Sequence, residues 1–567
     1  MSSSSYDEFP VVIGIDFGTT YSGCSYAFVQ NKEVVDIQRW PRQGGDPYPK
    51  VPSQSIYPHG SKQLQSWGHG ARHIMSTPDG KNMLMLRKFK LYLDENLHLP
   101  PLPNHLSVVD VISDYLGAFH SYVLGELRKS FGAYDNKHFR YCLTVPAMWS
   151  DRAKAAMRLA AIRAGLVGPH DHPDRLLLIS EPEAAALYCE KKCEQFNLQP
   201  GNRFMICDAG GGTVDLVVFE IEEQFGVRSL KEITKGHGSS CGSTFLDENM
   251  RRLLESKLAR LGRLPTMVFE QLMQRFVDDV KPNFDGQSDH FIHLPAGIML
   301  QDGESYADIG IEDNMLRLTA QELKMAVFDP VINSVLGLID EQLRQAKWLD
   351  AIFLVGGFGQ SDYLHECVKH TFVSTGRVGL VGVPPRGALA VVRGAVMFGL
   401  YPRVIAQRIA RRSYGVETTM RFEPGLDPAE YSFIRADGNR YCRYRFSIYC
   451  YKGQPVRVDE CVTKTYSVTY PNDTDCDLFA CDLDGPTPRL TTHPAIRKVA
   501  AFPIKMPNFP DLKHGDRVQM TVKMFFGLTE LKINVRIRDR EFIFTSTFEN
   551  EDPNPQAYSA SPPPYSS

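Results

Sequence analysis

The stretch that decides the fold is Phe204-Met-Ile-Cys-Asp208-Ala-Gly210-Gly211-Gly212-Thr213-Val-Asp215-Leu-Val-Val-Phe-Glu-Ile221. An apolar run ends at Asp208, passes three glycines and Thr213, and continues as a second apolar run. This pattern predicts a strand, a tight glycine turn and a returning strand. The glycines let backbone N–H groups surround an anion, Thr213 can add a donor, and Asp208 can face a cation that phosphates bring. A glycine-rich hairpin between two core strands is the alternative, and this stretch alone does not separate the two.

A second copy of the same design lies near the N-terminus, at residues 11–29. An apolar run again ends at an aspartate, Asp16, and Gly18, Thr19 and Thr20 form the turn before an alternating run. The pair indicates an internal duplication, because each copy is followed by a long mixed helix and strand segment. Two such turns can face each other across a cleft and bind one ligand, which favours phosphate binding over the bare hairpin.

The totals exclude several classes of protein. A length of 567 residues predicts two to four domains. With 63 basic and 66 acidic residues the net charge is −3, so no global field attracts nucleic acid or an anionic membrane. The sequence predicts no signal peptide and no membrane span, since the best apolar run, 389–400, is interrupted by Arg393. Twelve cysteines without a Cys-x-x-Cys pair indicate reduced thiols in a cytoplasmic or nuclear protein.

The segment between the two glycine turns predicts alternating strands and helices. Residues 141–145 form an expected strand, Ser150 an expected N-cap for a helix through 164, and residues 176–179 another strand. Ser180 and Glu183 have capping-box spacing at the start of the next helix. Glu181 has two interpretations, a helix-start charge or a site carboxylate, and this segment alone favours the first.

After the second turn the chain predicts a helical lobe at 245–284, a strand-rich piece at 291–318, and a long helix from the capping box Thr319-x-x-Glu322 to about residue 347. Residues 351–355 then form a buried strand that opens onto Gly356 and Gly357. Such a turn can seat a nucleoside by close backbone approach. A tight strand–helix packing turn is an equally good interpretation.

From about residue 401 the composition changes. A basic connector over 401–412 contains Arg403, Arg408, Arg411 and Arg412, and a solvated linker face is favoured there over a site for an acidic partner. Residues 413–550 predict a β-sandwich, in which Leu531, Ile533, Val535 and Ile537 alternate with polar residues. Residues 1–10 and the Pro/Ser tail 551–567 are expected to be disordered. The tail ends in Pro562-Pro-Pro-Tyr565, which resembles a WW-domain ligand, although so short a match is often accidental.

The motifs, taken in order, resemble the heat shock protein 70 family. They are Gly14-Ile-Asp-Phe-Gly-Thr-Thr-Tyr-Ser22, Val145-Pro-Ala147, Glu181-Pro182 with Ala184-Ala-Ala186, Asp208-Ala-Gly-Gly-Gly-Thr-Val-Asp215, Leu354-Val-Gly-Gly357 and Arg393-Gly-Ala395. The resemblance covers residues 11–400, and details such as Gly356-Gly-Phe-Gly359 look closest to the divergent heat shock 70 kDa protein 12-like branch. It implies an actin-like ATPase domain of two duplicated ribonuclease H-like lobes, with a helical lobe inserted at about 242–318, followed by a sandwich that binds client protein segments.

The resemblance also implies the site residues for ATP and Mg²⁺. Asp16 and Asp208 would organise the hydrated metal, Asp208 would orient or deprotonate the attacking water, and Glu181 would act at the metal-water site, which reverses the capping interpretation. The catalytic lysine falls within 88–90, where we choose Lys90 over Lys88. The remaining positions would bind the nucleotide: Gly18, Thr19, Thr20, Tyr21, Gly210, Gly211, Gly212, Thr213, Gly242, Lys281, Gly356 and Gly357. Positioning and charge neutralisation supply most of the acceleration in phosphoryl transfer.

The chain also departs from the family pattern. Pro282 and Gln360 stand where typical members sandwich adenine between two arginines, and Phe358 replaces a serine. Two lost cation–π contacts of ~0.5–2 kcal/mol each predict roughly ten-fold to several hundred-fold weaker binding unless Phe358 stacks instead. The loop 238–244 lacks an acidic pair, the acidic-leucine linker is replaced by the basic connector, and no helical lid follows the sandwich.

Three functions therefore compete. The first is a slowly hydrolysing, chaperone-like ATPase that binds client segments, with a possible co-chaperone or WW-domain partner. The second is a nucleotide-sensing scaffold with little or no hydrolysis, which the altered adenine end and connector favour. The third, a sugar-kinase or actin-like relative, shares the glycine turns but does not predict the sandwich.

Overall fold

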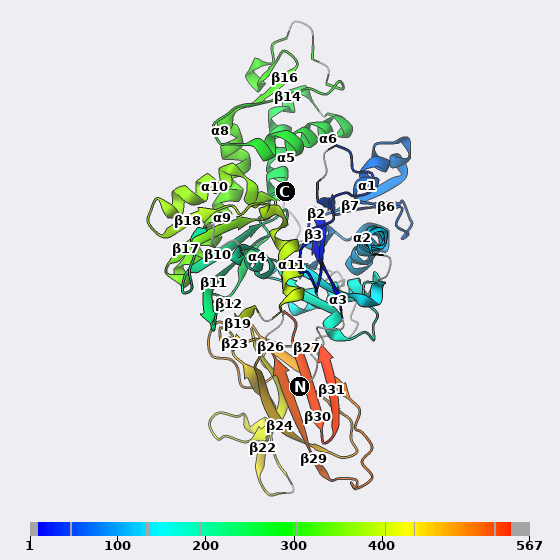
Figure 1. Ribbon diagram of the computed structural model, residues 1–567, viewed down its shortest axis with the longest axis vertical. Coiled ribbons are helices and arrows are strands. Elements are labelled where there is room, and N and C mark those ends of the chain that lie inside the picture. Colours follow the sequence, from blue (N-terminus) through cyan, green and yellow to red (C-terminus); the bar gives the residue numbers. More distant parts are fainter. Residues whose placement is uncertain are drawn as a thin grey trace, which may run out of the picture.

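The computed structural model describes residues 9–45, 48–131, 135–191, 196–262, 264–298, 300–301, 304–402, 404–435, 437–526 and 529–545. Residues 1–8, the tail 551–567 with its Pro562–Tyr565 motif, and Arg403 lie outside these residues. The disorder expected over residues 1–10 is wrong at residues 9 and 10, because Phe9 is buried and the Pro10 carbonyl accepts from the Val29 N–H at 3.0 Å. Within the described residues the chain forms a large α/β domain followed by a β-sandwich (Figure 1).

The first lobe is built on a six-stranded sheet in the order β3-β2-β1-β8-β9, with β4 also paired to β2. β1 and β2 are an antiparallel hairpin around the first glycine turn, whereas β8 and β9 continue parallel to β1. Helices α2 and α3 pack with this sheet around one apolar core. The elements of the lobe are β1 (Val11–Phe17), β2 (Tyr21–Phe28), β3 (Val35–Asp36), β4 (Lys50–Pro52), α2 (Val108–Ser130), β8 (Phe139–Val145), α3 (Asp151–Arg163) and β9 (Leu176–Ser180). A small sheet beside it holds β5 (Gln54–Pro58), β6 (Ser66–Trp67) and β7 (Met83–Arg87), next to α1 (Gly68–Met75).

The second lobe repeats this topology in an eight-stranded sheet, β18-β17-β10-β11-β12-β19-β23, with β13 paired to β11. β10 and β11 form the antiparallel hairpin, and β17 and β18 follow parallel to β10, as β8 and β9 follow β1. The duplication that the two aspartate–glycine stretches predict is therefore confirmed. Its elements are β10 (Arg203–Ala209), β11 (Val214–Gln224), β12 (Val227–Glu232), β13 (His237–Ser239), α9 (Asp329–Ala346), β17 (Leu349–Val355), α10 (Asp362–Val368) and β18 (Val378–Gly382).

Two helices, α4 (Glu181–Glu190) and α11 (Ala390–Leu400), cross between the two sheets (Figure 1). Their contact is very close, because a Cβ built on Gly394 would lie 1.6 Å from the carbonyl oxygen of Ala184. Glycine and alanine at this crossing let the two backbones approach, and the helices share one buried apolar cluster with both sheets.

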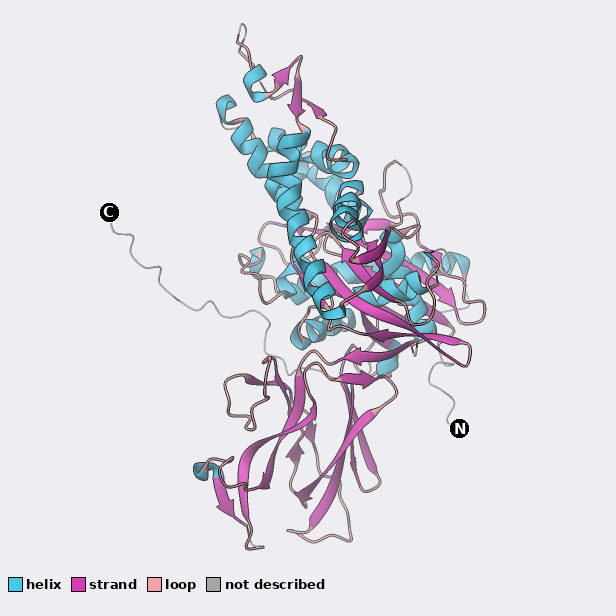
Figure 2. Ribbon diagram, turned by 90° about the vertical axis from the view of Figure 1, so that its left-hand side faces the viewer, coloured by secondary structure: helices cyan, strands magenta, loops and turns pink. Residues whose placement is uncertain are grey.

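A helical insertion rises from the second lobe, at the top of Figures 1 and 2. It contains α5 (Thr244–Lys257), α6 (Thr266–Arg275), α7 (Lys281–Asn283) and a small sheet of β14 (His290–His293), β15 (Ile311–Glu312) and β16 (Met315–Leu318). The predicted capping box is present, since the Thr319 hydroxyl accepts from the Glu322 backbone N–H at the start of α8 (Ala320–Glu322). The helix then continues through a π turn into α9 and ends at Ala346.

The basic connector is not a solvated linker face, so that expectation is wrong. Residues 405–409 form β19 (Ile405–Ile409), which runs parallel to β12 and extends the second-lobe sheet, with β23 (Pro455–Arg457) on its other edge. Arg408 is buried. The physical reason is that β12 offers an unpaired edge and that buried carboxylates lie where the arginine side chains arrive.

The C-terminal domain is a sandwich of two antiparallel sheets, ordered β21-β22-β20-β26-β27 and β24-β29-β30-β31 (Figure 2). The strands are β20 (Ser413–Arg421), β21 (Ser432–Ile434), β22 (Arg440–Cys450), β24 (Cys461–Thr469), β26 (Leu478–Cys481), β27 (Ile496–Ala500), β29 (Arg517–Phe525), β30 (Lys532–Ile537) and β31 (Arg540–Thr545), with the separate pair β25 (Thr474–Asp475) and β28 (Pro503–Ile504). The alternation predicted for β30 is confirmed, because Ile533, Val535 and Ile537 are fully buried. Among the described helices, none is both long and apolar enough to cross a bilayer.

Candidate functional site

The two glycine turns lie against each other. A Cβ built on Gly211 would lie 2.4 Å from the Thr20 hydroxyl, and one built on Gly212 would lie 2.5 Å from the Thr19 hydroxyl. Any side chain in the second turn would therefore displace the first. The structure brings together the residues that the sequence assigns to the two phosphate loops, and both turns come from the ends of equivalent strands.

Gly242 supports the second turn from behind. Its backbone N–H donates to the Gly212 carbonyl at 3.0 Å, and the N–H groups of Ser243 and Thr244 donate to the carbonyls of Gly210 and Gly211 at 3.0 and 2.8 Å. A Cβ on Gly242 would lie 2.6 Å from the Gly211 carbonyl oxygen. These bonds occupy the turn's carbonyl oxygens.

Four buried acidic side chains gather beside the turns. Asp16 is the next-to-last residue of β1, Asp208 and Asp215 face each other across the β10–β11 hairpin, and Glu181 is the first residue of α4. Burial, together with the charges of Glu181, Asp16 and Asp215, raises the pKa of Asp208 well above its usual range. Burial also raises the pKa of Glu181, against the opposing effect of the Lys90 ammonium. Such a cluster favours positive charge or protons in its neighbourhood.

Lys90, not Lys88, reaches this cluster. Lys90 is 3% exposed, forms an ion pair with Glu181, and its Nζ lies 5.4 and 5.8 Å from the ring centroids of Trp149 and Phe17. Lys88 instead has a left-handed backbone and is partly exposed, with its Nζ 3.4 Å from Glu248 on α5. The geometry thus separates two lysines that the sequence left almost equivalent.

Glu181 fits both interpretations that the sequence allowed, since it lies at the start of a helix and its carboxylate also belongs to the acidic cluster. It is the first residue of α4, whose N-cap is Ser180 with a complete capping box to Glu183, and its carboxylate is directed to Lys90. The capping function belongs to Glu183, which leaves Glu181 free to act in the acidic cluster.

Sequence reasoning missed two members of the cluster, Asp215 and Lys50. The Asp215 side chain is fully buried; its Oδ1 accepts from the Met148 backbone N–H at 3.3 Å, while its Oδ2 has no hydrogen-bond partner. Lys50 donates to Asp16 Oδ2 at 2.7 Å. Asp215 is the last residue of the glycine motif, and this position was a signal in the sequence that could have marked it as a site residue. Nothing in the local sequence marks Lys50.

The expected nucleoside end is arranged around Gly356 and Gly357. Gly356 has φ +80°, and a Cβ there would lie 2.5 Å from Asp208 Oδ1, whereas a Cβ on Gly357 would meet nothing within 4 Å. Phe358 is 5% exposed and packs in the second-lobe core, so it is not placed to stack on a base in this conformation. Lys281 pairs with Asp247 at 2.7 Å. Tyr21, from the first turn, contacts Arg72.

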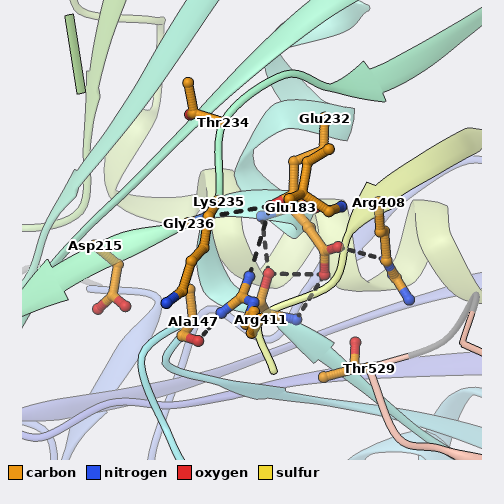
Figure 3. Close-up of polar contacts among 12 residues, drawn as sticks. Ala147, Glu183, Asp215, Glu232, Thr234, Lys235, Gly236, Arg408, Arg411 and Thr529 are labelled. Atoms are coloured by element: carbon orange, nitrogen blue, oxygen red, sulfur yellow. Dashed lines mark hydrogen bonds and ion pairs between the residues drawn. The ribbon is translucent and has the colours of Figure 1, made fainter. Parts of the chain in front are cut away.

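A buried charged cluster joins the connector to the second-lobe sheet and α4 (Figure 3). Arg408 Nε lies 2.6 Å from Glu183 Oε1, and Arg411 Nη2 lies 3.8 Å from Glu232 Oε1. Glu232 Oε2 also accepts from the Ile409 N–H at 2.9 Å. Burial raises the pKa of Glu232 to about 7, whereas the guanidinium groups of Arg408 and Arg411 outweigh burial at Glu183 and lower its pKa.

This connector cluster is continuous with the acidic cluster through two short routes. Glu183 lies two residues after Glu181 on α4. Arg411 donates to the Ala147 carbonyl, and the next residue, Met148, donates its N–H to Asp215. The two clusters are therefore linked by neighbouring residues of α4 and by hydrogen bonds through residues 147 and 148.

The sandwich is also held against the first lobe by buried polar contacts. Arg158 on α3 forms a two-pronged ion pair with Glu530, with Nε 2.6 Å from Oε1, and both residues are 8% exposed. The Tyr414 hydroxyl donates to Asp151 at 2.9 Å. The two domains are thus docked through specific side chains in addition to the β19 strand.

These features define the class of protein. A family model described as Hsp70 protein matches residues 118–419, more than half of the chain, and the chain belongs to this family. It is a nucleotide-binding protein with the actin-like ATPase fold, and a divergent, heat shock 70 kDa protein 12-like member.

Similar proteins support that placement. The chain is 28% identical to human heat shock 70 kDa protein 12B, over 93% of this chain and 89% of that protein. It is 26% identical to human heat shock 70 kDa protein 12A, over 93% and 90%. The similarity to chaperone protein DnaK of Methanothermobacter thermautotrophicus is 24% and covers 53% of this chain and 48% of that protein.

Proposed function

We propose that this protein binds Mg-ATP between its two lobes, hydrolyses it slowly, and couples the nucleotide state to the binding of protein segments by its sandwich. The observation that carries the proposal is the meeting of two duplicated aspartate–glycine hairpins beside the buried Lys90–Glu181 pair. Family membership supports nucleotide binding, and the remaining parts are our inference from the arrangement of the residues.

The site chemistry fits a phosphate-bound metal better than a metal held by protein alone. Among the described residues, no three His, Cys, Asp or Glu side chains are arranged as direct metal ligands. The unpartnered Oδ2 of Asp215 and the carboxylate of Asp208 can instead bind metal-coordinated water. When bound, Mg²⁺ neutralises phosphate charge.

The chain's own residues then have distinct tasks. The backbone N–H groups of the turns and the Thr19, Thr20 and Thr213 hydroxyls bind phosphate oxygens. The Lys90 ammonium, held by Glu181, places positive charge where the phosphoryl group is transferred. Asp208 orients the attacking water or accepts a proton from it.

Single-turnover hydrolysis of ATP by the purified full chain tests the enzymatic part. Asp208→Asn and Lys90→Met should each lower the rate by at least about 100-fold, the usual scale for one electrostatic or acid–base group. Lys88→Met is the matched control and should change the rate by less than about three-fold, because its side chain is directed to Glu248. Equal losses from Lys88→Met and Lys90→Met would contradict the assignment of Lys90.

The sandwich offers a place for a protein segment. A cavity of about 810 Å³ lies between β20, β22 and β24, and its lining includes Glu417, Arg443, Lys464, Tyr466 and Asp475. Among the described strands, β24 pairs only with β29, so its other edge borders this cavity. An extended segment can add to such an edge through its backbone. Lys464→Glu should weaken the binding of a labelled unfolded polypeptide, while Lys523→Glu, on β29 and outside the lining, serves as control.

A second function, a nucleotide-sensing scaffold with little hydrolysis, is favoured by one specific feature. Phe358 is buried and Gln360 is uncharged, so neither of these two positions supplies a cation or a stacking ring for the base in the part of the chain that the structure describes. A protein that retains ATP through purification and forms no ADP in a single-turnover assay would support this function over the first.

A further inference from the structure

Lys50, Gly23 and Asp16 form one row across three neighbouring strands. Lys50 on β4 is the register partner of Gly23 on β2, and Gly23 is the register partner of Asp16 on β1. Residues that are directly opposite in a sheet direct their side chains to the same face. The Lys50 and Asp16 side chains therefore share a face with only a glycine between them.

The missing side chain at Gly23 is what lets Lys50 cross to Asp16. A Cβ built on Gly23 would lie 3.1 Å from Lys50 Cγ and 3.6 Å from its Cε, so the lysine stem lies across this glycine. The ammonium then reaches Asp16 Oδ2 at 2.7 Å, while the Thr144 hydroxyl lies 3.4 Å from Oδ1. Both carboxylate oxygens of Asp16 thus already have partners within the chain.

The Lys50 ammonium also lies within the electrostatic range of the opposite lobe. Asp16, Tyr48 and Asp208 all interact electrostatically with this ammonium. Lys50 is 8% exposed, and its ion pair with Asp16 holds the ammonium in place. A buried cation therefore lies in contact with Asp16 of β1 and within electrostatic range of Asp208 of β10.

We propose that Lys50 supplies, as part of the chain, positive charge that a divalent cation would otherwise bring to Asp16, so that nucleotide binding depends only weakly on divalent metal. The inference rests on the proposed nucleotide binding and concerns how that site is regulated. It does not exclude Mg²⁺ from the bound nucleotide. The negative charge of the acidic cluster is already partly neutralised without a ligand, because Lys50 pairs with Asp16 and Lys90 pairs with Glu181.

The test is the ratio of two dissociation constants for fluorescent ADP, one in excess EDTA and one in excess Mg²⁺, measured on the full chain. For the wild type we expect a ratio below about 10, because a buried ammonium close to the site replaces much of the metal's attraction. Lys50→Met should raise the ratio by at least about ten-fold. Lys50→Arg, which keeps the charge, should stay closer to the wild type than Lys50→Met.

A purely structural ion pair would behave differently. It would lower stability in Lys50→Met without changing the ratio, and that result would overturn the inference. Lys257→Met is the matched control, because it removes another partly buried lysine, paired with Glu322 at 2.5 Å in the helical insertion. Gly23→Val offers an independent route, since its side chain would occupy the path of the lysine stem and should raise the ratio in the same direction.

The outcomes separate this inference from the proposed function. No binding of ADP in Mg²⁺ would contradict the proposed function itself. Binding in Mg²⁺ with a wild-type ratio above about 10 would leave that function intact and overturn only the role of Lys50. Because the wild-type ratio is decisive by itself, the test remains valid even where Lys50→Met fails to fold.

Discussion

The Arg158–Glu530 pair should control how firmly the sandwich is docked on the ATPase domain. Both side chains are 8% exposed, two nitrogen–oxygen contacts join them, and Arg158 Nη2 also donates to the Leu176 carbonyl at 2.8 Å. Removing one charge from a buried pair leaves the other uncompensated, at a cost of about 3–5 kcal/mol. Glu530→Gln keeps the shape and one acceptor, so we expect the lower value, about 3 kcal/mol.

Limited proteolysis of the native protein measures this docking. At about 1.4 kcal/mol for each factor of ten, a loss of 3 kcal/mol raises the population of the undocked state by more than roughly 100-fold. Cleavage at sites exposed only by undocking should accelerate accordingly while the sandwich remains folded. Lys532→Gln is the control within the same interface: its Nζ lies 3.8 Å from Asp174 in a more exposed pair, and its loss should cost less than about 1 kcal/mol.

A double-mutant cycle separates the pair from its surroundings. Arg158→Met combined with Glu530→Met replaces two charges by apolar groups, which is often close to neutral, so the double variant should be more stably docked than Glu530→Gln. If Glu530→Gln undocks no faster than Lys532→Gln, the pair does not hold the interface as we describe. The same conclusion follows if the loss of docking free energy in the double variant exceeds the sum of the losses in the two single variants.

Three further predictions concern other parts of the molecule. Burial raises the pKa of Glu232 to about 7, so this carboxyl favours folding while it is protonated and loses that contribution as pH rises from about 4.5 through 7. Glu232→Gln should flatten the part of this fall that lies between pH 5.5 and 8 by up to about 2 kcal/mol in urea titrations at these two pH values, and an unchanged slope would argue against it. Gly394→Ala should destabilise the protein by about 3 kcal/mol, because the new Cβ forces α4 and α11 apart. Gly337→Ala on α9 is the control and should be neutral or stabilising, because a Cβ there would meet nothing within 4 Å. Similar shifts in melting temperature for the two variants would contradict the close crossing. Gly356→Ala should weaken ADP binding by at least about ten-fold and should also lower stability by at least about 1 kcal/mol, because φ is +80° and the new Cβ would lie 2.5 Å from both Asp208 Oδ1 and the Ala209 carbonyl oxygen. Unchanged affinity in fluorescence titrations of the folded variant would remove Gly356 from the site.

The duplicated lobes could be predicted because each begins with a short-range signal. An apolar run that ends in aspartate and glycine specifies a strand and a turn within about ten residues, and two such signals in one chain specify a repeat. The capping boxes at Ser180 and Thr319 are equally local, and both are confirmed. The alternation in β30 shows its buried face directly.

The connector could not be predicted because its environment is set from far away in the sequence. Arg408 and Arg411 look like solvated charges until β12 supplies an edge for β19 and until Glu183 and Glu232 arrive beside them. Partners more than 170 residues distant leave no trace in local composition. The same reason explains the wrong expectation of a solvated face.

The residues of the candidate site fall into the same two groups, those that a local motif marks and those that only distant parts of the chain bring to the site. Residues within a motif, such as Asp16, Asp208 and the glycines, could be assigned from the sequence, and these residues do lie together in the structure. Lys50 lies outside every motif and joins the site only through the strand register that sets it opposite Gly23. Phe358 shows the opposite case, because a position within a motif directs its ring into the core instead of toward a base.

The central claim is that the two duplicated hairpins form one ATP site. Extraction and chromatographic identification of the nucleotide in the freshly purified 567-residue chain, compared with Asp208→Asn and Lys90→Met variants, tests it most directly. We expect bound ADP, with or without ATP, in the wild type, and a shift toward ATP in both variants, because they retain the turns but lose hydrolysis. A wild type that carries no nucleotide, and that binds neither added ATP nor ADP in Mg²⁺, would contradict the account.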